Sequence, residues 1–186
     1  LAMINDPNGI PENFATSWEA VSKSVFESEA FVNEIKRTNY YEADLATALK
    51  DATSPEQKMA IIHNFVKNKV KWNNYVGYFP EKGVKKAYSE GTGNTADINL
   101  MLISMLQHAG LTAYPVLVST KKNGIPVYPT REGFNYVIAA VNLLPLGKEA
   151  NDLDRVQARV FLVRGARKDG QSYPKIHVTH DSEGLR

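Results

Sequence analysis

The sequence predicts an α+β domain in which helices come first along the chain and strands come later. Three observations predict this class. Apolar residues recur at helical spacing through residues 16–72, whereas β-branched and aromatic runs separated by turn signals occupy residues 113–179. Between these parts, the glycine-bounded stretch Gly91–Gly110 predicts one buried central helix. Runs of helices followed by runs of strands favour α+β over an alternating α/β sheet.

The first part of the chain is predicted to form four helices. Thr16-Ser-Trp-Glu19 indicates a capping box at the start of the first helix. Two further helices are expected, from about Ser28 to Lys36 and from Tyr41 to Lys50. Ser54-Pro-Glu-Gln57 is a stronger start signal, because serine can cap, proline is favoured at the first helical position and glutamine completes the box. We expect this fourth helix to end near Trp72.

The central helix should begin at a well-formed cap. Asn94 is expected to cap it together with Asp97, and Gly110 stands where a left-handed residue ends a helix. Nearly every position between them is apolar, so the helix should be buried on all sides. Because the first N–H groups of a helix are unpaired and partly positive, a reacting or anionic group would sit near Asn94 to Asp97.

The remaining segments are predicted to be loops and strands. Residues 73–89 are rich in aromatic and turn residues and are predicted to form a loop beside a cleft. Residues 113–120 and 135–142 are predicted strands, joined by a turn and an irregular connection with two prolines. Residues 143–154 indicate a loop, and residues 156–179 a hairpin that turns at an Asp-Gly pair.

Composition narrows the possible functions. The chain has 186 residues, no cysteine and a formal net charge of +2. The lack of cysteine excludes thiol nucleophiles, disulfides and cysteine-ligated metals. The small net charge gives no argument for nucleic acid, and the longest apolar run, around Leu100 to Leu106, is far shorter than the roughly 20 residues a bilayer requires. The histidines are scattered, so we expect no metal site and no cofactor.

Several motifs follow one another between Ser54 and Val141. They are the helix ending in Val70-Lys-Trp72, the loop Gly91-Thr-Gly-Asn-Thr-Ala-Asp97, the segment His108-Ala-Gly-Leu-Thr-Ala-Tyr-Pro-Val116, Ser119-Thr120 with Asn123-Gly124, and Phe134-Asn-Tyr-Val-Ile138. In order and spacing, this half of the chain resembles the transglutaminase-like domain. That domain is a papain-related core found in microbial proteases, peptide-modifying enzymes and large bacterial cell-envelope proteins.

The resemblance implies a papain-like fold and a division of the chain. Residues 1–53 would form a helical segment packed on the core. Residues 54–142 would form the transglutaminase-like core, with the buried central helix against an antiparallel sheet. Residues 143–186 would add a loop and a β-hairpin that complete the sheet.

The resemblance also assigns catalytic positions. An active member has a cysteine at the start of the central helix, a histidine on the next long strand and an aspartate on the strand after it. Here the cysteine position is Thr95 and the histidine position is Tyr136, and no Leu-Asp-Ala-Thr context for the aspartate follows. A threonine hydroxyl is too weak an acid for activation by a helix dipole, and a phenol titrating near ~10 is a poor base. The cysteine mechanism cannot operate here.

The resemblance therefore predicts a catalytically inactive domain, a binding or structural module of a bacterial envelope protein, periplasmic or at the cell surface. The candidate binding residues are Trp72, Tyr75, Asn94, Thr95 and Tyr136, since aromatic surfaces suit peptides and glycans. The expected partner is a peptide or glycan in a vestigial cleft, or neighbouring domains of a longer chain. No nucleic acid and no membrane insertion are expected.

An alternative from another class is a peptidase-like or amidase-like hydrolase with a rebuilt site that uses Thr95 or Asp97. It requires a base within hydrogen-bond reach of the Thr95 hydroxyl. In the structural interpretation, Thr95 is a helix-capping hydroxyl, Tyr136 is a half-buried strand tyrosine and Asp97 complements the helix dipole. The surroundings of the Thr95 hydroxyl decide between these interpretations.

Overall fold

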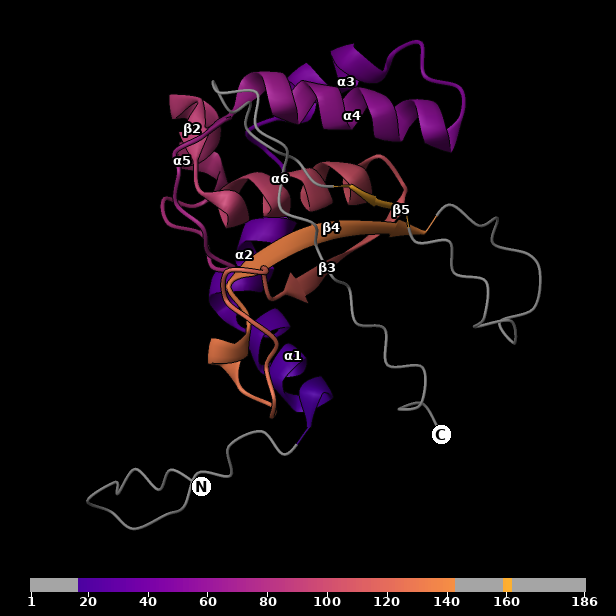
Figure 1. The fold of residues 1–186 in the computed structure, drawn as a ribbon. Coiled ribbons are helices and arrows are strands. Elements are labelled where there is room, and N and C mark those ends of the chain that lie inside the picture. The colour runs from indigo at the N-terminus through magenta and orange to yellow at the C-terminus, as the bar shows by residue number, and fades with distance from the viewer. Residues whose placement is uncertain (1–16, 143–158, 162–186) are drawn as a thin grey trace, which may run out of the picture.

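The computed structural model describes residues 17–142 and 159–161 of the chain (Figure 1). These residues form an α+β fold, as the sequence predicts. The elements, in chain order, are α1 (Trp18–Phe26), α2 (Glu29–Lys36), α3 (Glu42–Leu49), α4 (Pro55–Lys69), β1 (Lys71–Trp72), α5 (Val84–Glu90), β2 (Thr92–Gly93), α6 (Thr95–His108), β3 (Thr112–Val118), the 3-10 helix η1 (Arg131–Gly133), β4 (Tyr136–Asn142) and β5 (Arg159–Phe161).

The N-terminal helices share one hydrophobic core with the central helix. Phe31 of α2 and Leu45 of α3 are buried in the same cluster as the apolar residues of α6. The cap of α1 is Ser17, whose side chain accepts a hydrogen bond from the Ala20 N–H at 3.2 Å. The cap predicted at Thr16 is therefore one residue too early, because Ser17 has the extended backbone that a cap requires.

Helix α4 begins as predicted and ends earlier than predicted. The Ser54 hydroxyl accepts the Gln57 N–H at 3.2 Å, and the Gln57 side chain accepts the Ser54 N–H at 3.4 Å. The helix stops at Lys69 instead of Trp72 because the following backbone is extended and pairs with the segment before α6. The Lys71 N–H donates to the Gly91 carbonyl at 2.8 Å, which makes β1 a parallel partner of β2.

The predicted loop 73–89 contains a short helix, α5, at its end. Val84, Ala87 and Tyr88 lie on one face of this helix and are buried. They are three and four residues apart, which is the spacing of neighbours on a helix face. Gly91 ends the helix in the left-handed conformation, with φ of 67°. The sequence prediction missed this helix because the aromatic and turn residues before α5 favour a loop.

Helix α6 is the centre of the fold, as predicted. All its residues from Thr95 to Leu106 are buried, including the polar Asn99 and Ser104. Gly110, with φ of 83°, ends it as expected: the N–H groups of Gly110 and Leu111 donate to carbonyls of the last turn, both at 3.0 Å. Figure 1 shows α6 lying between α4 and the strands β3 and β4.

The larger of the two sheets in the described residues is antiparallel, in the order β3-β4-β5. In its register, Thr112 pairs with Asn142 and Val118 pairs with Tyr136. The predicted strands 113–120 and 135–142 are therefore confirmed, and β5 falls within the predicted hairpin of residues 156–179. The rest of the predicted C-terminal hairpin and the predicted loop 143–154 lie outside the described residues. Within the residues described, no helix is long and apolar enough to cross a membrane.

Candidate functional site

Two buried polar residues form the start of α6. The Asn94 side-chain oxygen accepts the Asp97 N–H at 2.8 Å, and the Asp97 carboxylate accepts the Asn94 N–H at 3.0 Å. This reciprocal pair is the predicted capping box. Asp97 is 0 % exposed, so the carboxylate satisfies backbone donors inside the protein and does not face a substrate.

Asp97 also binds the start of α5, which has no side-chain cap of its own. Its Oδ1 accepts the Gly83 N–H at 3.0 Å, and its Oδ2 accepts the backbone N–H of Lys82 at 3.5 Å. The next N–H, of Val84, donates to the Glu34 carboxylate of α2 at 2.6 Å. One aspartate therefore caps two helices, a role that the sequence did not reveal because the second helix itself was missed.

The environment of Asp97 sets its protonation. Burial raises the pKa of this carboxyl above the usual 3.8, while the backbone N–H donors around it act in the opposite direction. The closely packed Gly93 helps to enclose it, because a Cβ at this glycine would lie 2.8 Å from the Asp97 Cβ. A carboxyl enclosed in this way is suited to holding backbone in place and not to exchanging protons with a bound substrate.

The Thr95 hydroxyl is held by the backbone of a single residue in the loop before α5. It donates to the Gly77 carbonyl at 2.6 Å and accepts the Gly77 N–H at 2.9 Å. The Thr95 N–H, at the start of the helix, donates to the Tyr75 carbonyl at 3.3 Å, and the residue is 4 % exposed. The cap is Asn94, so the interpretation of Thr95 as a capping hydroxyl is wrong: this hydroxyl anchors the loop.

The aromatic residues of the predicted site belong to the same loop. The Trp72 indole N–H donates to the Tyr75 carbonyl at 2.8 Å, and the Asn94 amide donates to the Phe79 carbonyl at 2.9 Å. With the two bonds to Gly77, these contacts fasten residues 73–79 over the start of α6. The Tyr75 side chain itself is 65 % exposed, and Val76 beside it is also exposed.

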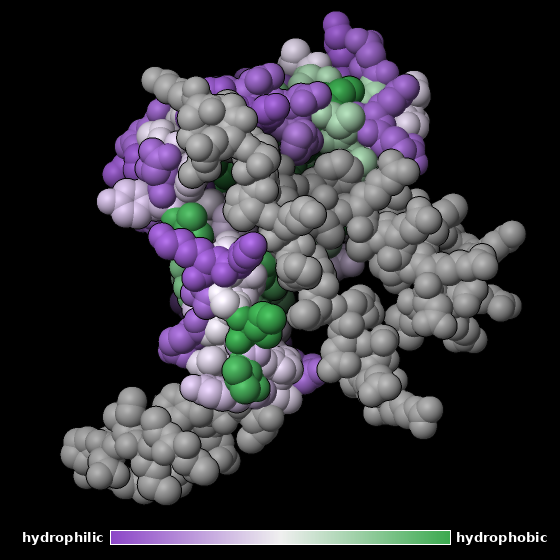
Figure 2. Space-filling model, viewed as in Figure 1, coloured by the Kyte–Doolittle hydropathy of each residue, from purple (hydrophilic) through white to green (hydrophobic). Residues whose placement is uncertain are grey.

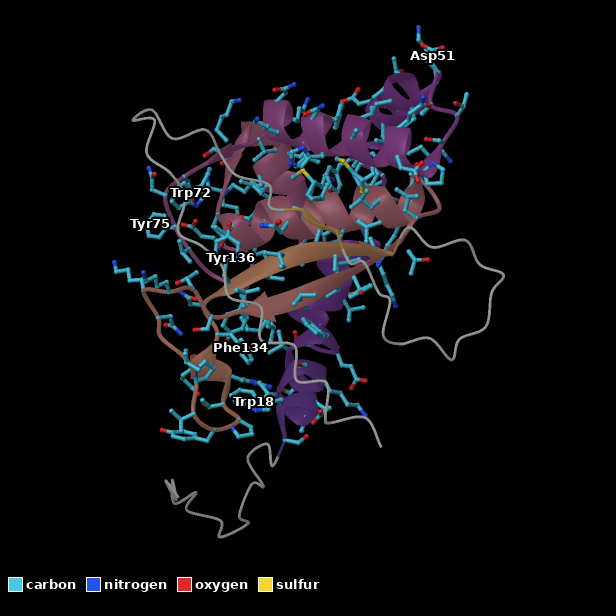
Figure 3. The ribbon with its side chains drawn as sticks, turned by 45° about the vertical axis from the view of Figure 1, so that its right-hand side comes forward. Trp18, Asp51, Trp72, Tyr75, Phe134 and Tyr136 are labelled. Carbon is cyan, nitrogen blue, oxygen red and sulfur yellow. The ribbon has the colours of Figure 1, made fainter. Side chains whose placement is uncertain are left out.

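Tyr136 is half-buried and begins β4, opposite Val118. In Figure 3, Trp72, Tyr75 and Tyr136 lie on one side of the molecule, and Figure 1 shows that β4 and α6 begin at this same end. The structure thus joins Trp72 and Thr95 to the Tyr75 carbonyl and Asn94 to Phe79 of the same loop, and it places Tyr136 at the same end of the fold.

The sequence profile of the transglutaminase-like superfamily matches residues 43–158, which is more than half of the chain. The chain belongs to the transglutaminase-like superfamily. Among solved structures, a "putative protease" from Parabacteroides distasonis ATCC 8503 is similar at 12% identity, with a TM-score of 0.45, over 66% of this chain and 23% of that protein. The chain spans less than a quarter of that protein's length. No curated protein sequence matches it.

Two features of this transglutaminase-like domain were missed in the sequence. Gly77 supplies both backbone partners of the Thr95 hydroxyl, and nothing in a sequence reveals which residue will accept a side-chain bond. Asn99 is fully buried one turn after Thr95; its amide donates to the Thr95 carbonyl at 2.8 Å, and its oxygen has no partner among the described residues. A polar residue one turn into an apolar helix was the available signal.

The described residues hold no other arrangement that competes with this site. Among them, no group of three or more metal-binding side chains is present. An apolar groove lies between α2 and β3, lined in part by Phe31, Ile35 and Tyr114. None of the five predicted binding residues lines it.

Proposed function

We propose that this chain is a catalytically inactive transglutaminase-like domain that serves as a binding or structural module of a bacterial envelope protein. The observation that carries the proposal is the Thr95 hydroxyl, whose proton is directed at the Gly77 carbonyl, 2.6 Å away. A nucleophilic hydroxyl must pass its proton to a base. A peptide carbonyl is not such a base, and within the described residues both partners of this hydroxyl belong to Gly77.

The geometry also argues against the hydrolase alternative. A helix start can stabilise an oxyanion through its free N–H groups, but the Thr95 N–H is already directed at the Tyr75 carbonyl. Asp97, the other candidate, is buried and binds the starts of two helices. Each group that the alternative requires is already used by the fold.

The binding role rests on the exposed aromatic surface beside this closed site. Tyr75 is exposed and its backbone is fixed by Trp72 and Thr95, so its ring is presented from an ordered loop. A fixed aromatic face stacks well on a sugar ring or an apolar peptide side chain. The proposed ligand is a peptide or glycan, with neighbouring domains as the other partner. The envelope location, periplasmic or at the cell surface, rests on the family resemblance.

An activity assay tests the first half of the proposal. We expect no hydrolysis or transamidation of peptide amides by the full chain, and no difference between it and Thr95→Ala or Asp97→Asn. Turnover that disappears in either variant would show a rebuilt catalytic site and overturn the proposal.

A binding titration tests the second half. Peptidoglycan fragments and short glycans would be titrated into the labelled protein and followed by NMR. We expect Tyr75→Ala to weaken binding about tenfold or more. Tyr128→Ala is the matched control, because this tyrosine is equally exposed on another loop. If no fragment shifts any resonance near residues 72–79, the domain is a spacer or docks its neighbours and binds no such ligand.

A further inference from the structure

The loop of residues 119–135 joins β3 to β4 and presents large apolar side chains to solvent. Part of its polar set, the side chains of Ser119, Thr120, Asn123 and Asn135, forms hydrogen bonds at the base of the loop. Loops on a water-facing surface normally have the opposite arrangement.

The base of the loop is closed by side-chain hydrogen bonds. Asn135 spans it twice, because its oxygen accepts the Thr120 N–H at 2.9 Å and its amide donates to the Thr120 hydroxyl at 2.9 Å. Asn123 donates to the Ser119 hydroxyl at 3.0 Å and to the Gly133 carbonyl at 3.2 Å. These bonds hold the two arms of the loop together.

Further contacts fasten the loop to helix α1. The Arg131 guanidinium donates to the Ser24 hydroxyl at 3.0 Å and to the Ser24 carbonyl at 3.3 Å. Phe134 meets the edge of the Trp18 ring, with centroids 5.6 Å apart. Pro126 packs so closely on Gly133 that a Cβ there would lie 2.7 Å from the proline. The outward position of the tip is therefore built into the loop.

The tip presents three large apolar side chains within four residues. Val127 is 90 % exposed, Ile125 81 % and Tyr128 70 %, the highest values among the exposed large hydrophobic residues of the described chain. Figure 2 shows hydrophobic surface over this loop, at the lower end of the described residues. Single exposed apolar residues need no explanation, whereas a group on an ordered loop marks a contact surface.

We propose that this tip inserts into the headgroup region of an anionic lipid bilayer. Aliphatic side chains with a neighbouring tyrosine suit the boundary between acyl chains and headgroups. Pro126 and Pro129 have no backbone N–H. The tip therefore has two fewer donors that would need a hydrogen-bond partner when it leaves water. The proposed contact is peripheral and separate from the function proposed above, since no helix of the described residues could span a bilayer.

Charge near the tip favours an anionic membrane over an apolar pocket of another protein. Lys121 and Lys122 are both exposed. Lys122 lies three residues before Ile125, so their backbones are at most roughly 11 Å apart, compared with a Debye length of about 8 Å at physiological salt. Lysines at that distance add attraction to anionic headgroups. The third cation of the loop, Arg131, is directed at Ser24. The acid beside it, Glu132, accepts a hydrogen bond from the Thr130 hydroxyl, so the loop keeps a net positive charge.

Vesicle co-sedimentation of the full chain tests the proposal. We expect binding to vesicles of phosphatidylcholine mixed with phosphatidylglycerol and weaker binding to phosphatidylcholine alone. Ile125→Ser with Val127→Ser should lower the partition coefficient about tenfold or more. Lys121→Gln with Lys122→Gln should remove the preference for the anionic lipid. Val76→Ser with Tyr114→Ser is the control, two exposed apolar residues outside this loop, and should bind like the wild type.

A reporter at the tip gives a second readout. In Tyr128→Trp, the added indole fluorescence should shift to the blue with vesicles and be quenched by brominated lipids. Wild-type protein that stays in the supernatant, a serine variant that binds as well as the wild type, or a tip indole that remains in a water-like environment would each overturn the proposal. If the tip instead bound an apolar pocket of another protein, the wild-type protein would stay in the supernatant.

Discussion

Two loops of this domain differ in the hydrogen-bond partners of their polar groups. Residues 73–83 lie over the start of α6, where their N–H and C=O groups are bound by Asn94, Thr95 and Asp97. Residues 119–135 bind their own polar groups at the base and leave an apolar tip in solvent. The first loop contributes to the free energy of unfolding through its bonds to α6, whereas the tip of the second loop contributes little to it. Substitutions in the two loops should therefore differ sharply in their effect on unfolding.

The largest effect is expected at Asp97. Its replacement by alanine leaves the buried N–H of Asn94 and the half-buried N–H of Gly83 without their acceptor. Each such group costs about 1–3 kcal/mol, so the free energy of unfolding should fall by about 3–5 kcal/mol. Urea denaturation measures this value. Asp97→Asn keeps the shape and one acceptor oxygen and should lose less; equal losses would show that the two caps do not matter.

A smaller effect is expected at Thr95. Thr95→Val keeps the volume but removes both hydrogen bonds to Gly77, which should lower the free energy of unfolding by about 1–2 kcal/mol. Thr95→Ser retains the hydroxyl and is the control for polarity. If the valine variant were as stable as the wild type, the loop would not depend on this anchor.

The pH dependence of stability separates burial from hydrogen bonding at Asp97. Burial raises the pKa of the folded carboxyl above its usual value of 3.8, so the folded state holds this proton more tightly than the unfolded state. The contribution of Asp97 is then fully present below pH 3.8 and declines as pH rises through the folded pKa. Unfolding free energies of wild type and Asp97→Asn, compared across this range, should show the difference falling with pH. A rising difference would mean that the N–H donors outweigh burial.

The smallest effect is expected at the tip of the second loop. Val127 is almost fully exposed, so Val127→Ser should change the free energy of unfolding by less than about 0.5 kcal/mol. Thermal unfolding measures the change. A loss comparable to that of Thr95→Val would end the contrast between the loops and show that the tip packs on the rest of the protein.

Local signals in the sequence located much of this fold. Ser54 with Gln57 and Asn94 with Asp97 were predicted as reciprocal caps, and both pairs have that geometry. Gly110 ends α6 with a positive φ, as its position predicted. These features succeed because a cap depends on residues three or four positions apart, all of which are visible in the sequence.

The failures have a common physical cause. Helix α4 was predicted to reach Trp72. Its predicted last residues are extended instead, because β1 pairs with β2, some twenty residues later in the chain. The second capping role of Asp97 and the bonds of Thr95 to Gly77 also join distant segments. The residue types of the site, Trp72, Tyr75 and Thr95 among them, could be read from the sequence. Which groups satisfy one another depends on tertiary contacts that spacing does not encode.

The double role of Asp97 has a consequence for motion. Because one carboxylate binds the N–H groups of the cap residues of both α5 and α6, lifting the loop away from α6 breaks both helix starts in a single event. The amide hydrogens of Gly83 and Asn94, eleven residues apart, should therefore exchange with deuterium at a shared opening free energy, as one cooperative unit. A ligand that held Tyr75 down would slow the exchange of both amides together.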